Sequence, residues 1–235
     1  MAMMQHPNLA VIHAMESWGG APVLVLEYLP GGTLADRIRH GVIPVAETIT
    51  LGEVLGDVLH HVHRAGFLHR DIKPSNIGFT DEGTAKLLDF GLVRMMNRLS
   101  DLSTVTDGTV LAPGATGQRR VASLLTADTA VQHIVGTPAY MSPEALATGS
   151  LDQGVDLWGL ALTLYEALTG SNPFIAPTID QTVTRVLQAA VPDARHTRPD
   201  CPPALAEFLA GALALERSRR PQSALEFSSS LRAIV

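Results

Sequence analysis

The chain has 235 residues, of which 46% are hydrophobic and 17% charged, so it can bury a core and is not a disordered polypeptide. Its formal net charge of −6 argues against a nucleic-acid partner, because domains that bind nucleic acid usually carry a basic excess. The single cysteine, Cys201, excludes an internal disulfide and fits a reducing compartment, the cytoplasm. No apolar run is long enough and uncharged enough to predict a membrane segment.

The first 33 residues predict a short helix end, a hairpin and a turn. Residues 1–8 are interpreted as the end of a helix, because a proline disfavours helical geometry at the residue before it. Apolar runs at 9–15 and 22–29, separated by Trp18-Gly19-Gly20, indicate two antiparallel strands. A proline and two glycines then turn the chain, and Thr33 is a suitable cap for a short helix towards Arg39.

Most of the remaining chain predicts helices. Within 47–65 the apolar residues recur at helical spacing, and Gly66 is suited to end that helix. Residues 154–168 are apolar nearly all round, which is typical of a central buried helix closed by Gly170. Three further amphipathic helices are expected at 179–191, 202–215 and 222–234. His60 and His63 have the spacing of metal ligands, but the sequence suggests no third ligand, so metal binding there is disfavoured.

The most informative stretch is the loop at 69–76. Pro74 keeps it out of helical geometry, so that an acid (Asp71), a cation (Lys73) and an amide (Asn76) can be directed at one point. A second acid, Asp89, follows thirteen residues after Asn76 and is flanked by Phe90 and Gly91. Oxygen ligands, an ammonium group and a free carboxylate suit a magnesium-bound phosphate that must meet a hydroxyl nucleophile.

These motifs carry a family resemblance. The pattern H-R-D-x-K-x-x-N followed by D-F-G resembles protein kinases, specifically the bacterial, eukaryotic-like (Hanks-type) serine/threonine branch. The segment G-T-P-A-Y-M-S-P-E at 136–144 resembles the substrate-docking and A-P-E segment of that family. The D-L-W-G at 156–159 and the R-P at 220–221 resemble the start of its buried helix and its late arginine.

The resemblance implies an α+β, protein kinase-like fold. Residues 1–29 would be a remnant of the small lobe, with a helix tail, two strands and the hinge. Residues 30–235 would be the mainly α-helical large lobe, with a long activation segment at 89–144. The implied cofactors are ATP and Mg²⁺, and the implied partner is a protein with a serine or threonine acceptor.

Roles follow from the resemblance, residue by residue. Asp71 would be the catalytic base, Lys73 would neutralise phosphate charge, and Asn76 and Asp89 would hold magnesium. The remaining implied sites are nucleotide binding at Leu26, Glu27, Leu29 and Ile77, substrate docking at Thr137, and regulation by Arg70 with phosphorylated Thr129 or, as second choice, Thr126. Asp156 would fix the catalytic loop, and Glu144 and Arg220 would form a buried, structural ion pair.

Two departures from the family pattern qualify these expectations. Gly78 stands where the family usually has a large aliphatic wall of the adenine site. No glycine-rich phosphate loop and no lysine precede Lys73, so we expect a fragment, or a start assigned too late, with weak or no activity alone. A naturally shortened protein is the less favoured reading.

The function expected from the sequence is therefore ATP-dependent phosphorylation of serine or threonine on a protein. The alternative is a pseudokinase-like interaction module that performs no catalysis. A small-molecule phosphotransferase of the aminoglycoside type shares the loop chemistry, but the segment around Thr137 and Glu144 favours a protein substrate.

Overall fold

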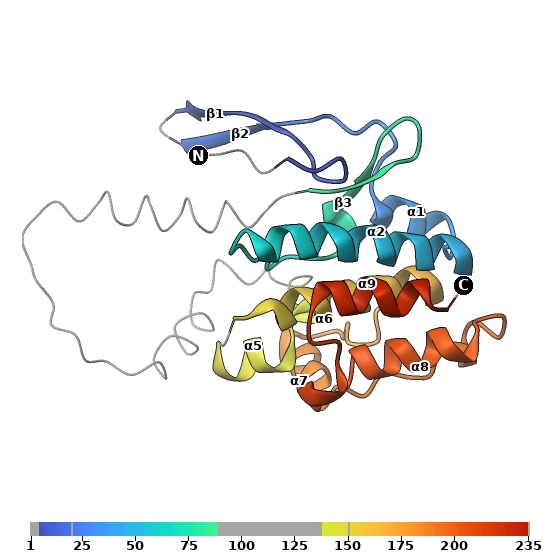
Figure 1. Ribbon diagram of the computed structural model, residues 1–235. Helices are drawn as coiled ribbons and strands as arrows, with labels where there is room; N and C mark the ends of the chain where they lie inside the picture. The colour runs from blue at the N-terminus through green and yellow to red at the C-terminus, as the bar shows by residue number, and fades with distance from the viewer. Residues whose placement is uncertain (1–4, 20, 89–137, 150, 235) are drawn as a thin grey trace, which may run out of the picture.

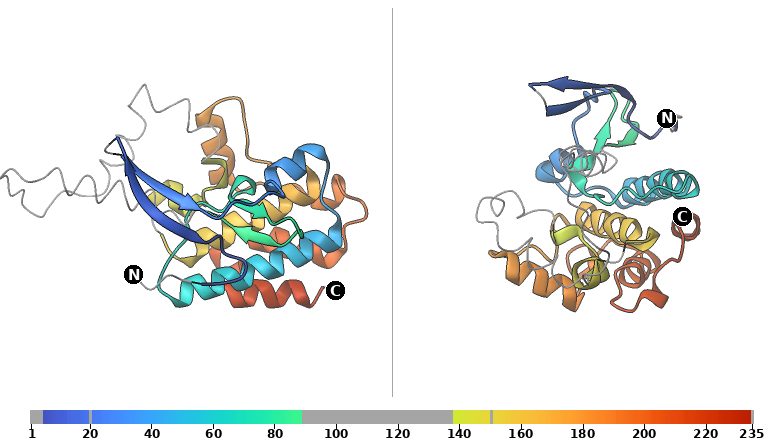
Figure 2. Two further views of the ribbon diagram at one scale, coloured as in Figure 1. Left: turned by 90° about the horizontal axis from the view of Figure 1, so that it is seen from above. Right: turned by 90° about the vertical axis from the view of Figure 1, so that its left-hand side faces the viewer.

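The computed structural model describes residues 5–19, 21–88, 138–149 and 151–234. Figure 1 shows a small hairpin of two strands, β1 (Ile12–Trp18) and β2 (Ala21–Leu26), above a larger helical part. The right-hand view of Figure 2 shows the same separation. The hinge between the two parts is formed by the chain that leaves β2 and enters α1 (Leu34–His40).

The hairpin is antiparallel, with Trp18 opposite Ala21 and Ile12 opposite Leu26. Its first strand begins later than the sequence predicted. Leu9 and Ala10 instead pair with Leu87: Ala10 N–H donates to the Leu87 carbonyl at 3.0 Å. The Leu9 side chain is only 2% exposed and packs in the large core, so burial determines which sheet this segment joins. Residues 5–8 form no helix, and residues 1–4 lie outside the described residues.

A second, very small sheet lies beneath the hinge, and the sequence analysis did not predict it. Strand β3 (Ile77–Phe79) pairs antiparallel with β4 (Ala85–Leu87). Strand β3 directly follows the loop that ends at Asn76, and β4 ends two residues before Asp89. The sheet therefore anchors the end of that loop and the chain just before Asp89.

The helices agree with the predicted ones within a few residues at each end. Within the described ranges, the helices after α1 are α2 (Val45–Arg64), α5 (Pro143–Thr148), α6 (Gln153–Thr169), α7 (Ile179–Gln188), α8 (Pro203–Ala212) and α9 (Ala224–Arg232). Thr33 caps α1 in a capping box with Asp36, and Gly66 and Gly170 adopt left-handed geometry at the ends of α2 and α6. The short α5 was not predicted.

The core is centred on α6, on which Trp158, Leu160, Leu162 and Leu164 have no exposed surface. Helix α2 packs against both α6 and α9, and α8 also contacts α6. This helical block holds the start of the candidate loop, because that loop follows α2 directly. Among the residues that the structure describes, no helix is long and apolar enough to cross a membrane.

Candidate active site

The loop at 69–76 runs from the end of α2 to the short 3₁₀ helix η1 (Pro74–Asn76). Arg70 adopts a left-handed conformation with φ 67°, which is uncommon for a residue with a side chain. Such a conformation persists only where the surroundings hold it. Pro74 occupies the first turn of η1, where its missing N–H costs nothing.

Three of the predicted side chains meet at one carboxylate. Asp71 Oδ2 accepts hydrogen bonds from Lys73 Nζ at 2.6 Å and from Asn76 Nδ2 at 3.0 Å. Asn76 Nδ2 also donates to the Asp71 backbone carbonyl at 2.8 Å, so Oδ1 is the polar atom that Asn76 can offer to a cation. The side chains of Asp71 and Lys73 are 25% and 22% exposed, which leaves them accessible to a substrate.

The buried carboxylate of Asp156, at the start of α6, holds the loop from below. Its Oδ1 accepts from the Arg70 N–H at 2.7 Å, and its Oδ2 accepts from the His69 N–H at 2.9 Å. The family resemblance implied that Asp156 would fix this loop. The same Oδ2 contacts His63 Nε2 at 2.7 Å. Charge-assisted hydrogen bonds of this kind offset the cost of burying Asp156 and keep Arg70 in its unusual conformation.

The contact of His63 was not predicted from the sequence, in which His63 stood out only by its metal-ligand spacing to His60. The structure buries its side chain against Asp156, with only 3% exposed. The signal available was weak, because the two residues lie 93 positions apart. Within the described ranges, histidine, cysteine and acidic side chains form no group of three or more suited to a metal ion.

The end of β4 is tied to the same loop. The Leu88 N–H donates to the Asn76 carbonyl at 2.8 Å, and the His69 ring nitrogen Nε2 lies 2.8 Å from the Leu88 carbonyl. The next residue, Asp89, lies outside the described residues, as do Thr126, Thr129 and Thr137.

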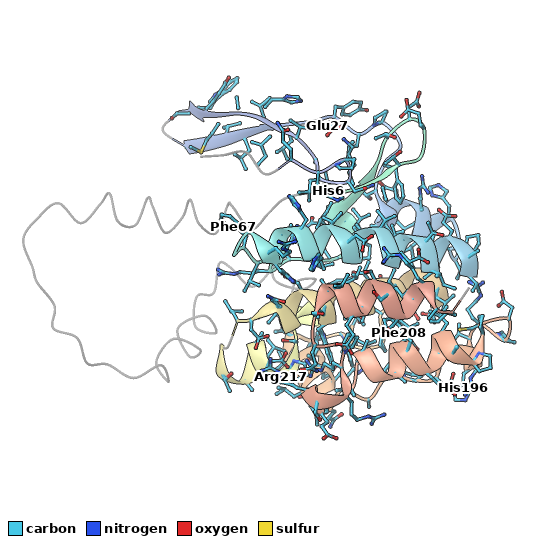
Figure 3. All side chains as sticks on the ribbon, viewed as in Figure 1. His6, Glu27, Phe67, His196, Phe208 and Arg217 are labelled. Atoms are coloured by element: carbon cyan, nitrogen blue, oxygen red, sulfur yellow. The ribbon has the colours of Figure 1, made fainter. Side chains whose placement is uncertain are left out.

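The hinge residues lie on the opposite side of this small sheet from the core. Leu26, Glu27 and Leu29 are half-buried, and Figure 3 shows Glu27 between the hairpin and the small sheet. Ile77 differs from the expectation: it has no exposed surface and packs in the core. Successive residues of a strand face opposite sides, so Ile77 faces the core and Gly78 faces the hinge.

The predicted ion pair between Glu144 and Arg220 is present. Arg220 Nη1 donates to both carboxylate oxygens of Glu144, at 2.9 and 3.1 Å, and the guanidinium lies over the Trp158 ring, 4.7 Å from its centroid. Arg220 also donates to the carbonyls of Ala214 and Leu215. The pair links α5, at the end of the segment that contains Thr137, to the C-terminal helices.

Comparisons with known proteins identify the family of the chain. The family model of the protein kinase domain matches residues 1–229. Over its whole length the chain is 33% identical to serine/threonine-protein kinase PknL of Mycobacterium tuberculosis, and it spans 52% of that protein. It is 30% identical, over 95% of its length, to the DNA damage-responsive serine/threonine-protein kinase RqkA of Deinococcus radiodurans, of which it spans 30%.

The fold class expected from the sequence is confirmed by the family match and by the architecture, a mainly helical lobe with a remnant β-hairpin. The chain spans about half, or less, of the length of these curated relatives. The family model matches nearly the whole chain, the loop at 69–76 carries the family motif, and the named relatives are bacterial kinases. The chain therefore belongs to the protein kinase family, on its bacterial serine/threonine branch.

Proposed function

We propose that the protein transfers the terminal phosphoryl group of ATP to a serine or threonine hydroxyl of a protein substrate. The bond from the γ-phosphorus to the bridging oxygen breaks, a bond to the hydroxyl oxygen forms, and ADP leaves. The observation that carries this proposal is the convergence of Lys73 and Asn76 on Asp71 Oδ2. This convergence holds the Asp71 carboxylate beside the Lys73 ammonium group, and phosphoryl transfer depends on such fixed positions of the base and of the cation.

Asp71 is the proposed base that accepts the proton of the substrate hydroxyl. Its Oδ2 is engaged by Lys73 and Asn76, and among the described residues no side chain donates to its Oδ1. Oδ1 is thus the atom suited to orient the hydroxyl. Lys73 is the proposed neutraliser of charge on the transferring group, since its ammonium lies 2.6 Å from the base. Asp156 is proposed to position both residues through the backbone of the loop.

ATP and Mg²⁺ are the proposed cofactors. The side chains fit a hard cation, because Asn76 commits both hydrogen bonds of its amide nitrogen to Asp71 and so offers its oxygen. Asn76 and Asp89 are the residues proposed to hold the ion, which would neutralise the charge of the phosphates. We propose that the hinge residues Leu26, Glu27 and Leu29 contact the nucleotide base.

Regulation is proposed to involve Arg70. Its side chain is exposed, next to the catalytic base, and among the described residues only its backbone N–H is engaged. A phosphorylated threonine would pair well with this guanidinium, and Thr129 is the first candidate and Thr126 the second. Thr137 is proposed to bridge Asp71 and Lys73 during substrate docking.

The test is transfer of radiolabelled phosphate from ATP to a general protein substrate and to the chain itself, followed by phosphoamino-acid analysis. We expect phosphoserine or phosphothreonine from the wild type, and a rate lower by about 10²–10⁴ for Asp71→Asn, the usual contribution of a general base.

The matched control is Asp81→Asn, a change of the same type in the exposed turn between β3 and β4. It should leave the rate unchanged. Equal rates for Asp71→Asn and the wild type would contradict the assignment of the base. Binding of Mg-ATP without any transfer would favour the interaction module.

A further inference from the structure

The segment from His6 to Ala10 lies along the edge of strand β4 that β3 leaves free. Asn8 Nδ2 donates to the Ala85 carbonyl at 2.8 Å, and the Asn8 carbonyl accepts from the Leu87 N–H at 2.8 Å. The Ala10 N–H donates to the Leu87 carbonyl at 3.0 Å. Strand β4 is therefore held on one edge by β3 and on the other edge by this segment.

The His6 side chain stabilises the docked form of the segment. Its Nδ1 accepts a hydrogen bond from the Asn8 N–H at 3.1 Å. Because a backbone N–H can only donate, Nδ1 carries no proton, and the single ring proton of the neutral imidazole is on Nε2. A second proton would have to bind at Nδ1, where it would break the hydrogen bond from Asn8. The docked geometry is therefore compatible only with a neutral His6.

A second imidazole, that of His61 on the last turn of α2, lies next to the first. The two ring centroids are 5.4 Å apart, and Figure 3 shows His6 just above α2. Two imidazolium ions at this distance would repel each other. The acidic side chain that acts on His6 from α2 is Asp57, whose carboxylate also binds Arg232 of α9. Because Arg232 shares this carboxylate, Asp57 is limited in how far it can stabilise a charge on His6.

These surroundings lower the pKa of His6. Burial is the larger cause of the lowered pKa and the neighbouring His61 is the second, while Asp57 opposes them only in part. His6 of the docked segment is thus neutral at pH values where His6 of an undocked segment is already protonated. By linkage, docking has its full strength above the ordinary histidine pKa and weakens as the pH falls from that value through the lowered one.

We propose that His6 and His61 form a pH-sensitive contact, which keeps the segment at 8–10 on β4 at neutral pH and lets it open more often in mildly acidic solution. The inference goes beyond the proposed function, because opening needs neither nucleotide nor protein substrate. Strand β4 leads into Leu88, whose N–H donates to the Asn76 carbonyl at 2.8 Å. An open segment would leave β4 paired on one edge only, directly before the candidate active site.

The test is hydrogen exchange of the whole chain, measured as the protection factors of the Ala10 and Leu87 amides from about pH 7.5 to about pH 5. Protection factors are corrected for the intrinsic effect of pH on exchange, so they report the opening of the segment. In the wild type they should fall by about fivefold across this range, the usual effect of losing one hydrogen bond.

His6→Asn is the variant that isolates the effect of the proton. Asparagine Oδ1 can accept from the N–H two residues later, as His6 Nδ1 does, but it binds no proton in this pH range. The protection factors of this variant should therefore stay constant with pH. His61→Gln removes a repelling charge at an exposed position, so the fall should be smaller than in the wild type. The control is His196→Gln, which replaces an exposed histidine that Figure 3 shows far from His6, and it should behave as the wild type does.

Constant protection in the wild type, or an equal fall in His6→Asn, would overturn the inference. An undiminished fall in His61→Gln would do the same, and this exposed position tolerates substitution even if position 6 does not. Titration of the His6 ring, followed by NMR, gives an independent measurement: its midpoint should lie below the ordinary histidine pKa and rise in His61→Gln, and a midpoint at the ordinary value would contradict the inference. None of these measurements uses phosphate transfer, so the failure of this inference and the failure of the proposed function are distinguishable.

Discussion

Glu166 illustrates how the environment of a single residue sets a pH dependence. Its carboxyl lies half-buried on α6, where Tyr140 Oη donates a hydrogen bond to Oε2. Burial raises the pKa of Glu166, and the hydrogen bond from Tyr140 offsets this only in part. The folded state thus retains the proton at pH values where the unfolded chain has already lost it. The unfolding free energy therefore falls as pH rises from the ordinary glutamate pKa through the raised one.

Glu166→Gln should remove this pH dependence. The glutamine keeps an oxygen that can accept from Tyr140 and has no proton to lose, so the charged form no longer has to be buried. The midpoint of thermal unfolding of the variant, minus that of the wild type, should be more positive at pH 7 than at pH 4. Calorimetry at several pH values measures the difference. Glu207→Gln, on the exposed side of α8, is the control, and a difference for Glu166→Gln that stays constant with pH would contradict the account.

At the scale of elements, helix α2 packs closely against α9. A β-carbon at Gly56 would lie 2.8 Å from Ser228 Cβ and 3.3 Å from the Ser228 backbone. A β-carbon at Gly52 would instead meet the terminal methyl groups of Leu231 and Leu164, at 2.4 and 2.7 Å. Backbone atoms of a packed helix cannot move aside as a methyl group can, so the two glycines should differ in their tolerance of substitution.

Gly56→Ala should therefore destabilise the protein. Overpacking costs about 1–3 kcal/mol, which exceeds the gain of up to about 1 kcal/mol from replacing glycine in a helix. Gly52→Ala should cost less, because Leu231 and Leu164 can change rotamer. Urea unfolding of both variants measures this. The control is Gly211→Ala, whose β-carbon would have its nearest neighbour at 3.6 Å and which should be neutral or slightly stabilising. Equal losses for Gly52→Ala and Gly56→Ala would refute the distinction.

The same elements show which features the sequence could predict. The long helices were found because apolar periodicity and local end signals, such as Thr33 and Gly170, act within a few residues. Strands β3 and β4 were missed because three residues are too few to display a period. The start of β1 was misplaced because Leu9 is apolar in either sheet, and only tertiary burial decides which it joins.

The residues of the candidate site also divide into those that the sequence could predict and those that it could not. Asp71, Lys73 and Asn76 lie within one short loop, so their convergence followed from local spacing and the family motif. The partners that hold the site come from distant segments, as with Glu27 and Lys86, which are 59 positions apart. A single sequence contains no signal for such pairs unless a motif names both members, as it did for Glu144 and Arg220.

At the scale of the whole molecule, buried charge pairs connect segments that are far apart in the chain. Glu144 and Arg220 lie 76 positions apart, and their side chains are only 12% and 5% exposed. Arg217 and Asp152 form a neighbouring pair whose side chains are 49% and 48% exposed. Both pairs join a guanidinium to a carboxylate, but Arg220 is buried, lies over the Trp158 ring and also donates to two backbone carbonyls. Comparing the two pairs therefore measures what this whole buried arrangement contributes.

Arg220→Met should cost about 3–5 kcal/mol of unfolding free energy, because it leaves the Glu144 carboxylate buried without a partner. It also removes the hydrogen bonds to the Ala214 and Leu215 carbonyls. Adding Glu144→Gln to Arg220→Met should recover part of the loss, since no buried charge then remains unpaired; coupling energies between contacting residues are typically about 0.5–3 kcal/mol. Arg217→Met should cost less than about 1 kcal/mol, as for other exposed pairs. Urea unfolding of Arg220→Met, Glu144→Gln, the double variant and Arg217→Met measures the cycle and its exposed comparison. Equal losses for Arg220→Met and Arg217→Met would show that the buried pair does not hold α5 to the C-terminal helices.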